Sequence, residues 1–199
     1  MDKKGVRGAL GKIDFNAPVI LGMALVSLAL LGLNALLGGG LNRVFAAYYT
    51  SFGDIWMYAR LFTHELMHQD LAHYTNNILM ILAIGPMVEE KYGAKRLLLM
   101  IAVTSVVTGL VHIIFSHNTM LLGASGIVFM LILLASFANL REGKLPLTVI
   151  LVAVLYIGNE VVAGITTRDT VSHVSHIVGG LCGAAFGFYF KGKKADSVR

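Results

Sequence analysis

Long uncharged runs divide this sequence into segments that predict membrane-spanning helices. A helix needs about 20 consecutive, mostly apolar residues to cross a bilayer. Residues 17–37 contain no charged side chain and predict the first span. Residues 71–88 are also uncharged and end at Glu89, Glu90 and Lys91, which predicts a second span that stops at a membrane surface.

The longest run, residues 97–140, contains no acidic residue, lysine or arginine over 44 positions. As a single helix it would be about 66 Å long, roughly twice the hydrocarbon thickness of a bilayer. The run therefore predicts two spans, and the polar residues 116–118 (Ser-His-Asn) predict the tight turn that joins them.

Two further spans are predicted by residues 145–167, which contain the single acid Glu160, and by residues 170–190. The expected fold is an all-α polytopic membrane protein, a bundle of six transmembrane helices. Residues 17–190 would form the membrane domain. Its outer loop, at about 38–70, is too apolar and aromatic to be a plain linker, so we expect it to be structured.

The distribution of basic residues predicts the orientation of the bundle. If the N-terminus is inside, thirteen of the sixteen lysines and arginines lie in inside segments, and only Arg43, Arg60 and Arg168 lie outside. Basic residues are enriched in cytoplasmic loops. Residues 1–16 and 191–199 are therefore predicted to be cytoplasmic, and the basic balance gives no reason to expect a nucleic-acid partner.

The composition agrees with this architecture. The 199 residues are 56% hydrophobic and 14% charged, and the mean hydropathy is +0.74. Soluble domains contain about 25% charged residues, so an ordinary soluble enzyme is excluded. The single cysteine, Cys182, excludes an internal disulfide framework and a cysteine-rich zinc site.

Four polar residues are predicted to lie at nearly the same depth, although they belong to three different spans. Counting from the cytoplasmic charges at 1.5 Å per residue puts Ser125, His176, His73 and Asn77 about 18–24 Å up their helices. Polar groups inside a span are costly and are functional candidates by default. We therefore expect these side chains to meet in one layer near the outer face.

Each of these residues has a chemical role that suits its surroundings. Ser125 begins a helix, where free backbone N–H groups favour an oxyanion. His176 shares a helix face with Gly179, in a small-residue stripe that lets helices approach closely. A serine nucleophile with a histidine base is thus plausible, and His73 and Asn77, four residues apart, could donate to the oxyanion. No acid is expected in this layer near His176, which favours a dyad over a triad.

The same residues resemble the motifs of the rhomboid family. Residues 123–126 (Gly-Ala-Ser-Gly) are similar to its GxSG motif, and residues 175–179 (Ser-His-Ile-Val-Gly) resemble its last-helix AHxxG pattern, with serine in place of alanine. His68, His73 and Asn77 match its second-helix signature in their spacing.

Further likenesses lie outside this layer. Arg60 and Phe62 resemble the end of a first-loop motif, with Ala59 where tryptophan is usual, and Glu89 matches a family glutamate. Phe129 matches a position at which a family aromatic packs on the catalytic histidine.

The resemblance implies an intramembrane serine endopeptidase that cuts transmembrane-anchored proteins near the outer membrane face. By this likeness Ser125 is the nucleophile and His176 the base. His73, Asn77 and the Ser125 N–H form the oxyanion hole, and Gly123, Gly126, Phe129 and Gly179 support the site. No metal or cofactor is expected. The expected partners are a substrate with a transmembrane helix and the lipid bilayer, and the expected location is a prokaryotic plasma membrane.

Three alternatives remain open. Residues 64–68 (His-Glu-Leu-Met-His) form an HExxH zinc-protease string, in which Glu65 could act as a base. The depth count places His64 in the loop above the hydrocarbon, and no third ligand is evident. A rhomboid-like protein without proteolytic activity is a second alternative, and a transporter is a third. Within the serine-protease hypothesis, His173 is the competing candidate for the base.

Overall fold

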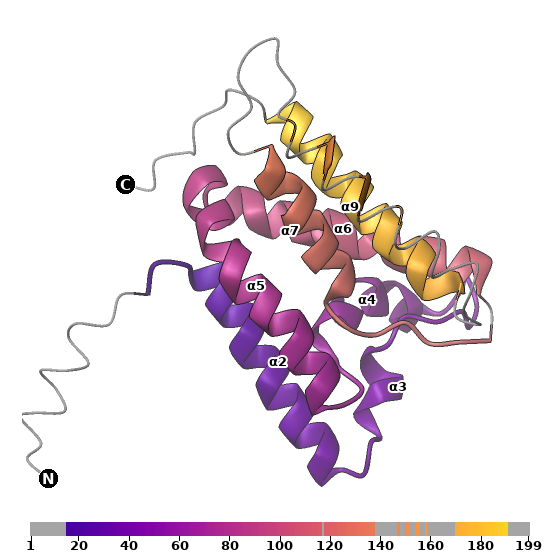
Figure 1. The fold of residues 1–199 in the computed structure, drawn as a ribbon. Coiled ribbons are helices and arrows are strands. Elements are labelled where there is room, and N and C mark those ends of the chain that lie inside the picture. The colour runs from indigo at the N-terminus through magenta and orange to yellow at the C-terminus, as the bar shows by residue number, and fades with distance from the viewer. Residues whose placement is uncertain are drawn as a thin grey trace, which may run out of the picture.

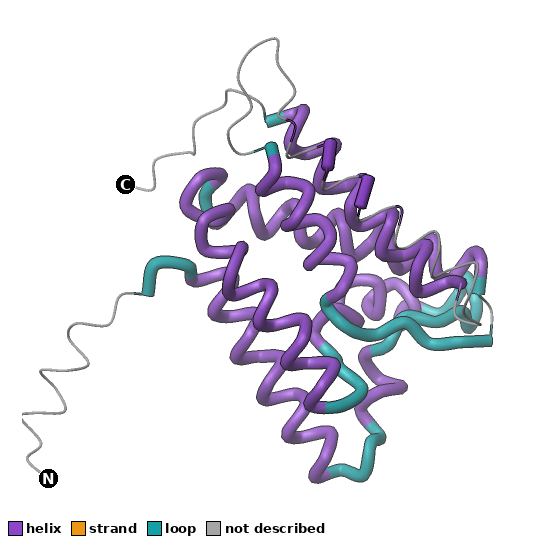
Figure 2. The backbone as a smooth tube through the Cα atoms, viewed as in Figure 1, coloured by secondary structure: helices purple, strands orange, loops and turns teal. Residues whose placement is uncertain are grey.

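The computed structural model describes residues 15–116, 118–137 and 170–190, together with Leu147, Ile150, Leu151, Val154, Leu155 and Gly158. Figure 2 shows that these residues form helices joined by loops. Within them the only extended pairing is a single bridge between Ala47 and Leu121. The expected all-α fold is confirmed for the part of the chain that the structure describes.

The helices follow the uncharged runs of the sequence. Their bounds are α2 (Pro18–Leu36), α3 (Leu41–Phe45), α4 (Ile55–Thr63), the one-turn 3₁₀ helix η1 (His64–Leu66), α5 (Leu71–Tyr92), α6 (Ala94–Phe115), α7 (Ser125–Ser136) and α9 (Thr170–Tyr189). Three of them, α2, α5 and α6, are long and apolar enough to cross a membrane. Most of the predicted span 145–167 lies outside the described residues, so the count of six stays a prediction.

A carboxylate from α5 caps the first turn of α2. The two oxygens of Glu89 accept hydrogen bonds from the backbone N–H groups of Val19 and Ile20, both at 3.0 Å. Early N–H groups of a helix have no partner within it. Glu89 is buried, and α5 continues beyond the uncharged run 71–88 to Tyr92.

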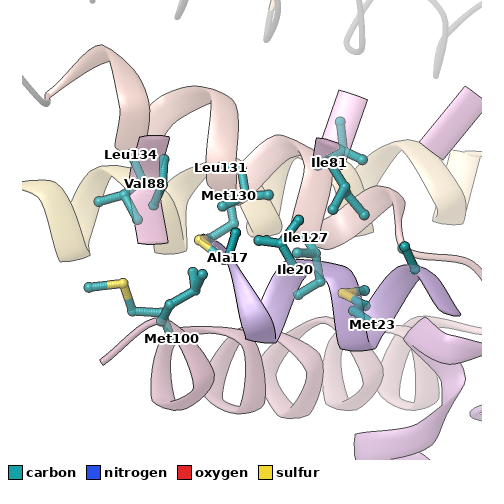
Figure 3. Packing of buried hydrophobic residues seen from close by; sticks show 14 of the residues in the cluster. Ala17, Ile20, Met23, Ile81, Val88, Met100, Ile127, Met130, Leu131 and Leu134 are labelled. Carbon is teal, nitrogen blue, oxygen red and sulfur yellow. The ribbon is translucent and has the colours of Figure 1, made fainter. Parts of the chain in front are cut away.

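The main apolar core lies where α2, α5, α6 and α7 meet. Figure 3 shows Ile20 of α2, Ile81 of α5, Met100 of α6 and Ile127 of α7 among its buried side chains. None of these four is measurably exposed. Cys182 and Phe186 of α9 pack against the same core.

Helices α7 and α9 lie side by side (Figure 1) and approach closely along three glycines. A Cβ atom at Gly179 would overlap the carbonyl oxygen of Gly126, and one at Gly183 would overlap that of Met130. At Gly187 it would lie 2.6 Å from the ring of Phe137. The predicted close-packing stripe is therefore confirmed.

The segment between α2 and α5 is structured, as expected. Asp54 caps α4 by accepting from the N–H of Trp56 at 2.9 Å and pairs with Arg60 at 3.1 Å. Arg60 is buried and its guanidinium lies 4.3 Å from the centre of the Tyr48 ring. After α4 the chain turns into η1, which lies among the helices rather than above them.

Candidate active site

The side chains of Ser125 and His176 are in hydrogen-bond contact. Their Oγ and Nε2 atoms are 2.8 Å apart. The ring of Phe129, one turn after Ser125, stacks on the imidazole with centroids 4.6 Å apart and planes inclined by 17°. The glycine contacts of α9 explain the short distance, because they bring its backbone against the first two turns of α7.

Backbone geometry starts α7 at the serine. Gly123 has φ +112°, a conformation that side-chain-bearing residues rarely adopt. Its N–H donates to the carbonyl of His64 at 3.0 Å, and the N–H of Ala124 donates to Nε2 of His68 at 3.3 Å. These two hydrogen bonds fix the backbone of the connection between α6 and α7 just before Ser125. The first N–H groups of α7 have no partner within the helix.

His73 and Asn77 of α5 lie beside the same turn. A Cβ atom at Gly123 would be 2.5 Å from the imidazole of His73 and 3.6 Å from Nδ2 of Asn77. Asn77 is buried, and its Nδ2 donates no hydrogen bond to any described group. The four polar residues predicted to share one depth thus do come together, two in direct contact and two against Gly123.

A cavity of about 460 Å³ opens at this cluster. Its lining residues are Asn42, Gln69, His73, Met120, Leu121, Leu122, Ser125 and His176. Asn42 and Gln69 were not predicted, because Asn42 lies in the short helix α3 and Gln69 in the non-helical segment before α5, and neither segment ends at a charged residue from which a depth can be counted. Their amides add polar groups to a cavity whose other lining residues are three polar side chains of the cluster and three apolar ones, Met120, Leu121 and Leu122.

His173 lies one turn before His176 and does not replace it. The two imidazole rings are 6.0 Å apart and nearly perpendicular. Since Nε2 of His176 is the nitrogen that contacts Ser125, the geometry favours His176 over His173 as the base.

The prediction that residues 64–68 lie above the layer in which the other polar residues meet is wrong, because His68 contacts Ala124 and Glu65 lies beside Gly126. His64 and His68 are fully buried. Nε2 of His64 donates to the carbonyl of Ser105 in α6 at 3.0 Å. The depth count failed because it treated the chain from His64 to Glu89 as one straight helix. In fact η1 ends at Leu66, and α5 begins only at Leu71.

Glu65 of the same string is an acid in the layer where none was expected. It lies beside Gly126, in the first turn of α7 with Ser125. Its Oε1 lies 3.3 Å from the hydroxyl oxygen of Thr108. A Cβ atom at Gly126 would lie 3.0 Å from the same Oε1 atom of Glu65. Burial raises the pKa of Glu65 to about 8, while hydrogen bonding to Thr108 and to the backbone of Ile127 opposes the rise. Burial likewise lowers the pKa values of His64 and His68 to about 4.

The HExxH string does not have the geometry of a zinc site. A helical string would place both histidines on one face, but only residues 64–66 are helical here, in a 3₁₀ turn. Nε2 of His64 and Nε2 of His68 are both used in hydrogen bonds to the backbone. Within residues 15–116, 118–137 and 170–190, no three histidine, cysteine or acidic side chains are grouped as metal ligands would be.

Comparison with known proteins gives one family. Residues 55–193 match the family model described as the Rhomboid domain. The chain is 31% identical over 148 residues to Rhomboid-related protein 1 of Caenorhabditis elegans, a match that covers 68% of this chain and 40% of that protein. It is 26% identical over 136 residues to Rhomboid protease GluP of Bacillus subtilis. This match covers 67% of this chain and 26% of that protein.

A third relative is Rhomboid protease GlpG of an Enterobacter species, 31% identical over 112 residues, which cover 54% of this chain and 38% of that protein. The three matches therefore span between about a quarter and two fifths of the relatives' own lengths.

Proposed function

This chain belongs to the rhomboid family, and from that premise we propose that it is an intramembrane serine endopeptidase with Ser125 and His176 as its catalytic dyad. The family and the apolar helices make it a multi-pass membrane protein. The observation that carries the proposal is the contact of 2.8 Å between Ser125 Oγ and His176 Nε2. Two of the relatives are named as proteases.

The first half of the reaction forms an acyl-enzyme. Neutral His176 takes the hydroxyl proton through Nε2 while Ser125 Oγ attacks the substrate carbonyl carbon. The carbonyl oxygen becomes an oxyanion, which the Ser125 N–H, His73 and Asn77 can stabilise by donating hydrogen bonds. The C–N bond then breaks, and His176 returns the proton to the leaving amine.

The second half releases the product. His176 removes a proton from water, the resulting hydroxide attacks the ester carbon, and the bond to Ser125 breaks as the serine regains its proton. The cavity lined by Asn42 and Gln69 supplies room for substrate and water beside Ser125. The stacked ring of Phe129 supports the orientation of the imidazole through both halves.

The proposed substrate is a membrane protein cut near the outer membrane face. A stable transmembrane helix keeps its carbonyl groups in internal hydrogen bonds. A segment with small or helix-breaking residues near that face exposes a carbonyl to Ser125 more readily.

The test compares wild type with Ser125→Ala, His176→Ala and His173→Ala in proteoliposomes that contain a transmembrane substrate. The first two variants should lose cleavage by about 10⁴-fold or more, whereas His173→Ala should keep most of it. A serine-directed phosphonylating reagent should label wild type at Ser125.

Two results would lead elsewhere. Wild-type cleavage by Ser125→Ala would refute the serine mechanism, and loss of cleavage in a chelator with recovery in zinc would favour the HExxH string. A wild-type protein that neither cleaves nor reacts with the reagent would indicate a rhomboid-like protein without proteolytic activity.

A further inference from the structure

Glu65 is a buried acid that the dyad mechanism does not use. It is 2% exposed and lies where η1, α6 and α7 meet. Its Oε1 lies 3.3 Å from Thr108 Oγ1, and that hydroxyl lies 2.9 Å from the backbone carbonyl of Thr104. The Oε2 atom has no hydrogen-bond partner among the described groups. Burying an acid in such a position costs free energy unless the group is hydrogen-bonded or neutral.

The contacts of Glu65 lead directly to the nucleophile. Gly126 follows Ser125, and a Cβ atom there would lie 3.0 Å from Glu65 Oε1 and 3.2 Å from Cγ2 of Thr108. The carbonyl of Gly126 is the group that α9 approaches at Gly179. Gly126 therefore has neighbours on two sides. Glu65 and Thr108 lie next to its Cα, and α9, the helix that carries His176, lies next to its carbonyl group.

We propose that Glu65 is a positioning residue whose carboxyl group supports the first turn of α7 and so keeps Ser125 against His176. This inference rests on the proposed serine-protease function and adds a residue to it. It also explains why the string 64–68 resembles a metal motif without its geometry: each of its three polar side chains contacts either α6 or the turn that leads into Ser125.

The protonated acid fits this site better than the carboxylate. Thr108 has a single hydroxyl proton, for which the Thr104 carbonyl at 2.9 Å competes with Glu65 Oε1 at 3.3 Å. When Thr108 donates to Thr104, a protonated Glu65 can donate to the Thr108 oxygen in turn. Burial raises the pKa of Glu65 to about 8, so the acid is protonated below that pH. Above it, the carboxylate would lose its donor role and favour leaving the buried position.

No described cation forms an ion pair with Glu65 that would hold it as a carboxylate. The elements packed against η1 carry titratable side chains on α4 and α6: Tyr58 and Arg60, and Lys95, Arg96 and His112. The charge of Arg60 is already paired with Asp54 at 3.1 Å, and Lys95 and Arg96 lie in the first turn of α6, about three turns before Thr108. Helix α2 and the first two turns of α7 contain no titratable residue. Burial lowers the pKa values of His64 and His68 to about 4, so neither becomes a cation between pH 6 and 9.

The experiment measures kcat and KM for a transmembrane substrate between pH 6 and 9 with wild type, Glu65→Gln, Glu65→Ala and the control Glu90→Ala. Glu90 is an exposed acid near the far end of α5. The rate of phosphonylation at Ser125 and the thermal unfolding transition are recorded for each variant. Ser125→Ala is included to test the proposed function separately.

We expect wild-type kcat to fall above about pH 8, and Glu65→Gln to keep kcat within about threefold at pH 7 and to lack that fall, because the amide does not ionise. Glu65→Ala should lower kcat and the phosphonylation rate by about tenfold or more, with KM nearly unchanged, because a misplaced nucleophile slows the chemical step. Glu90→Ala should match wild type.

Wild-type kcat in Glu65→Ala would overturn the proposal, and so would a Glu65→Gln profile with the same alkaline fall as wild type. A loss in Glu65→Gln as large as in Glu65→Ala would also overturn it. If Glu65→Ala does not fold, the pH profile of Glu65→Gln decides alone. Active Ser125→Ala would instead refute the serine mechanism itself, so the two failures are distinguishable.

Discussion

At the scale of single residues, Asn77 is the group whose environment most directly suggests a ligand. It is buried on α5, and its Nδ2 lies 3.6 Å from where a side chain at Gly123 would begin. No described group accepts a hydrogen bond from this nitrogen. A buried donor without an acceptor is unfavourable, and an oxyanion formed at Ser125 would provide the acceptor during the reaction.

Asn77→Ala should therefore lower kcat more than it raises KM. One oxyanion donor can contribute about 10²–10³ in rate. We expect a loss of about 10–100-fold here, because His73 and the Ser125 N–H remain as donors. Steady-state kinetics in proteoliposomes measure the effect.

The neighbouring Asn76 is exposed and provides the matched control. Asn76→Ala should have wild-type kinetics. Equal losses in the two variants would show that the effect is not specific to the buried amide, and the oxyanion assignment of Asn77 would then be withdrawn.

The positions of Ser125, His176, His73 and Asn77 could be predicted from the sequence because each lies on a helix that is followed by charged residues, which served as a reference for its depth. Glu65 had no such reference. It is separated from α5 by residues 67–70, which are not helical, so a count at 1.5 Å per residue misplaced its neighbour His64 and the string with it. The hydrogen bond that connects His68 to Ala124 was beyond prediction for the same reason.

At the scale of elements, the contact between α7 and α9 decides the geometry of the dyad. Its closest points are backbone against backbone at Gly179 and Gly183. A side chain at either point cannot be accommodated by a rotamer change, because the opposing atom is a main-chain carbonyl oxygen. Any added atom has to be accommodated by separating the helices.

Gly183→Ala should therefore destabilise the fold by about 1–3 kcal/mol, the usual range for overpacking. It should also reduce kcat, since the His176 helix would move away from Ser125. Unfolding in mixed detergent micelles measures the first effect and substrate cleavage the second.

Gly180→Ala is the control on the same helix. A Cβ atom there would be 3.6 Å from the side chain of Leu133, an ordinary contact. This variant should be at least as stable as wild type, because alanine favours a helix by about 1 kcal/mol over glycine. If both variants were equally stable and active, the close-packing interpretation of the stripe would be wrong.

Helix positions were the more predictable part of the fold. Uncharged runs located α2, α5 and α9 to within a few residues, because the hydrophobic requirement of the bilayer is a simple constraint on composition. Connections are not constrained in this way. The bridge between Ala47 and Leu121 and the cap from Glu89 to α2 depend on long-range contacts, which no local pattern indicates.

At the scale of the whole molecule, the predicted orientation can be tested with the chain's own composition. Cys182 is its single cysteine, so Cys182→Ala gives a background for single-cysteine labelling. Ser51 is exposed in the segment between α2 and α5, and Ser197 lies in the predicted cytoplasmic tail.

In intact cells, a membrane-impermeant maleimide should label Ser51→Cys, whereas Ser197→Cys should react only after permeabilisation, because the basic residues favour cytoplasmic termini. Labelling of Ser197→Cys in intact cells would reverse the orientation and would move the proposed cleavage site to the opposite face. Active Cys182→Ala protein is the required starting point.

The confinement of Gly126 also limits how the rate of this protein can be tuned by substitution. On the α9 side, glycine is already the smallest residue, so the helix spacing can only be increased there. On the other side, Glu65 and Thr108 can be replaced by larger or smaller groups. Variants that adjust the distance between Ser125 and His176 in both directions should therefore arise in η1 and α6, which makes these two segments the place to begin a search for faster or slower forms.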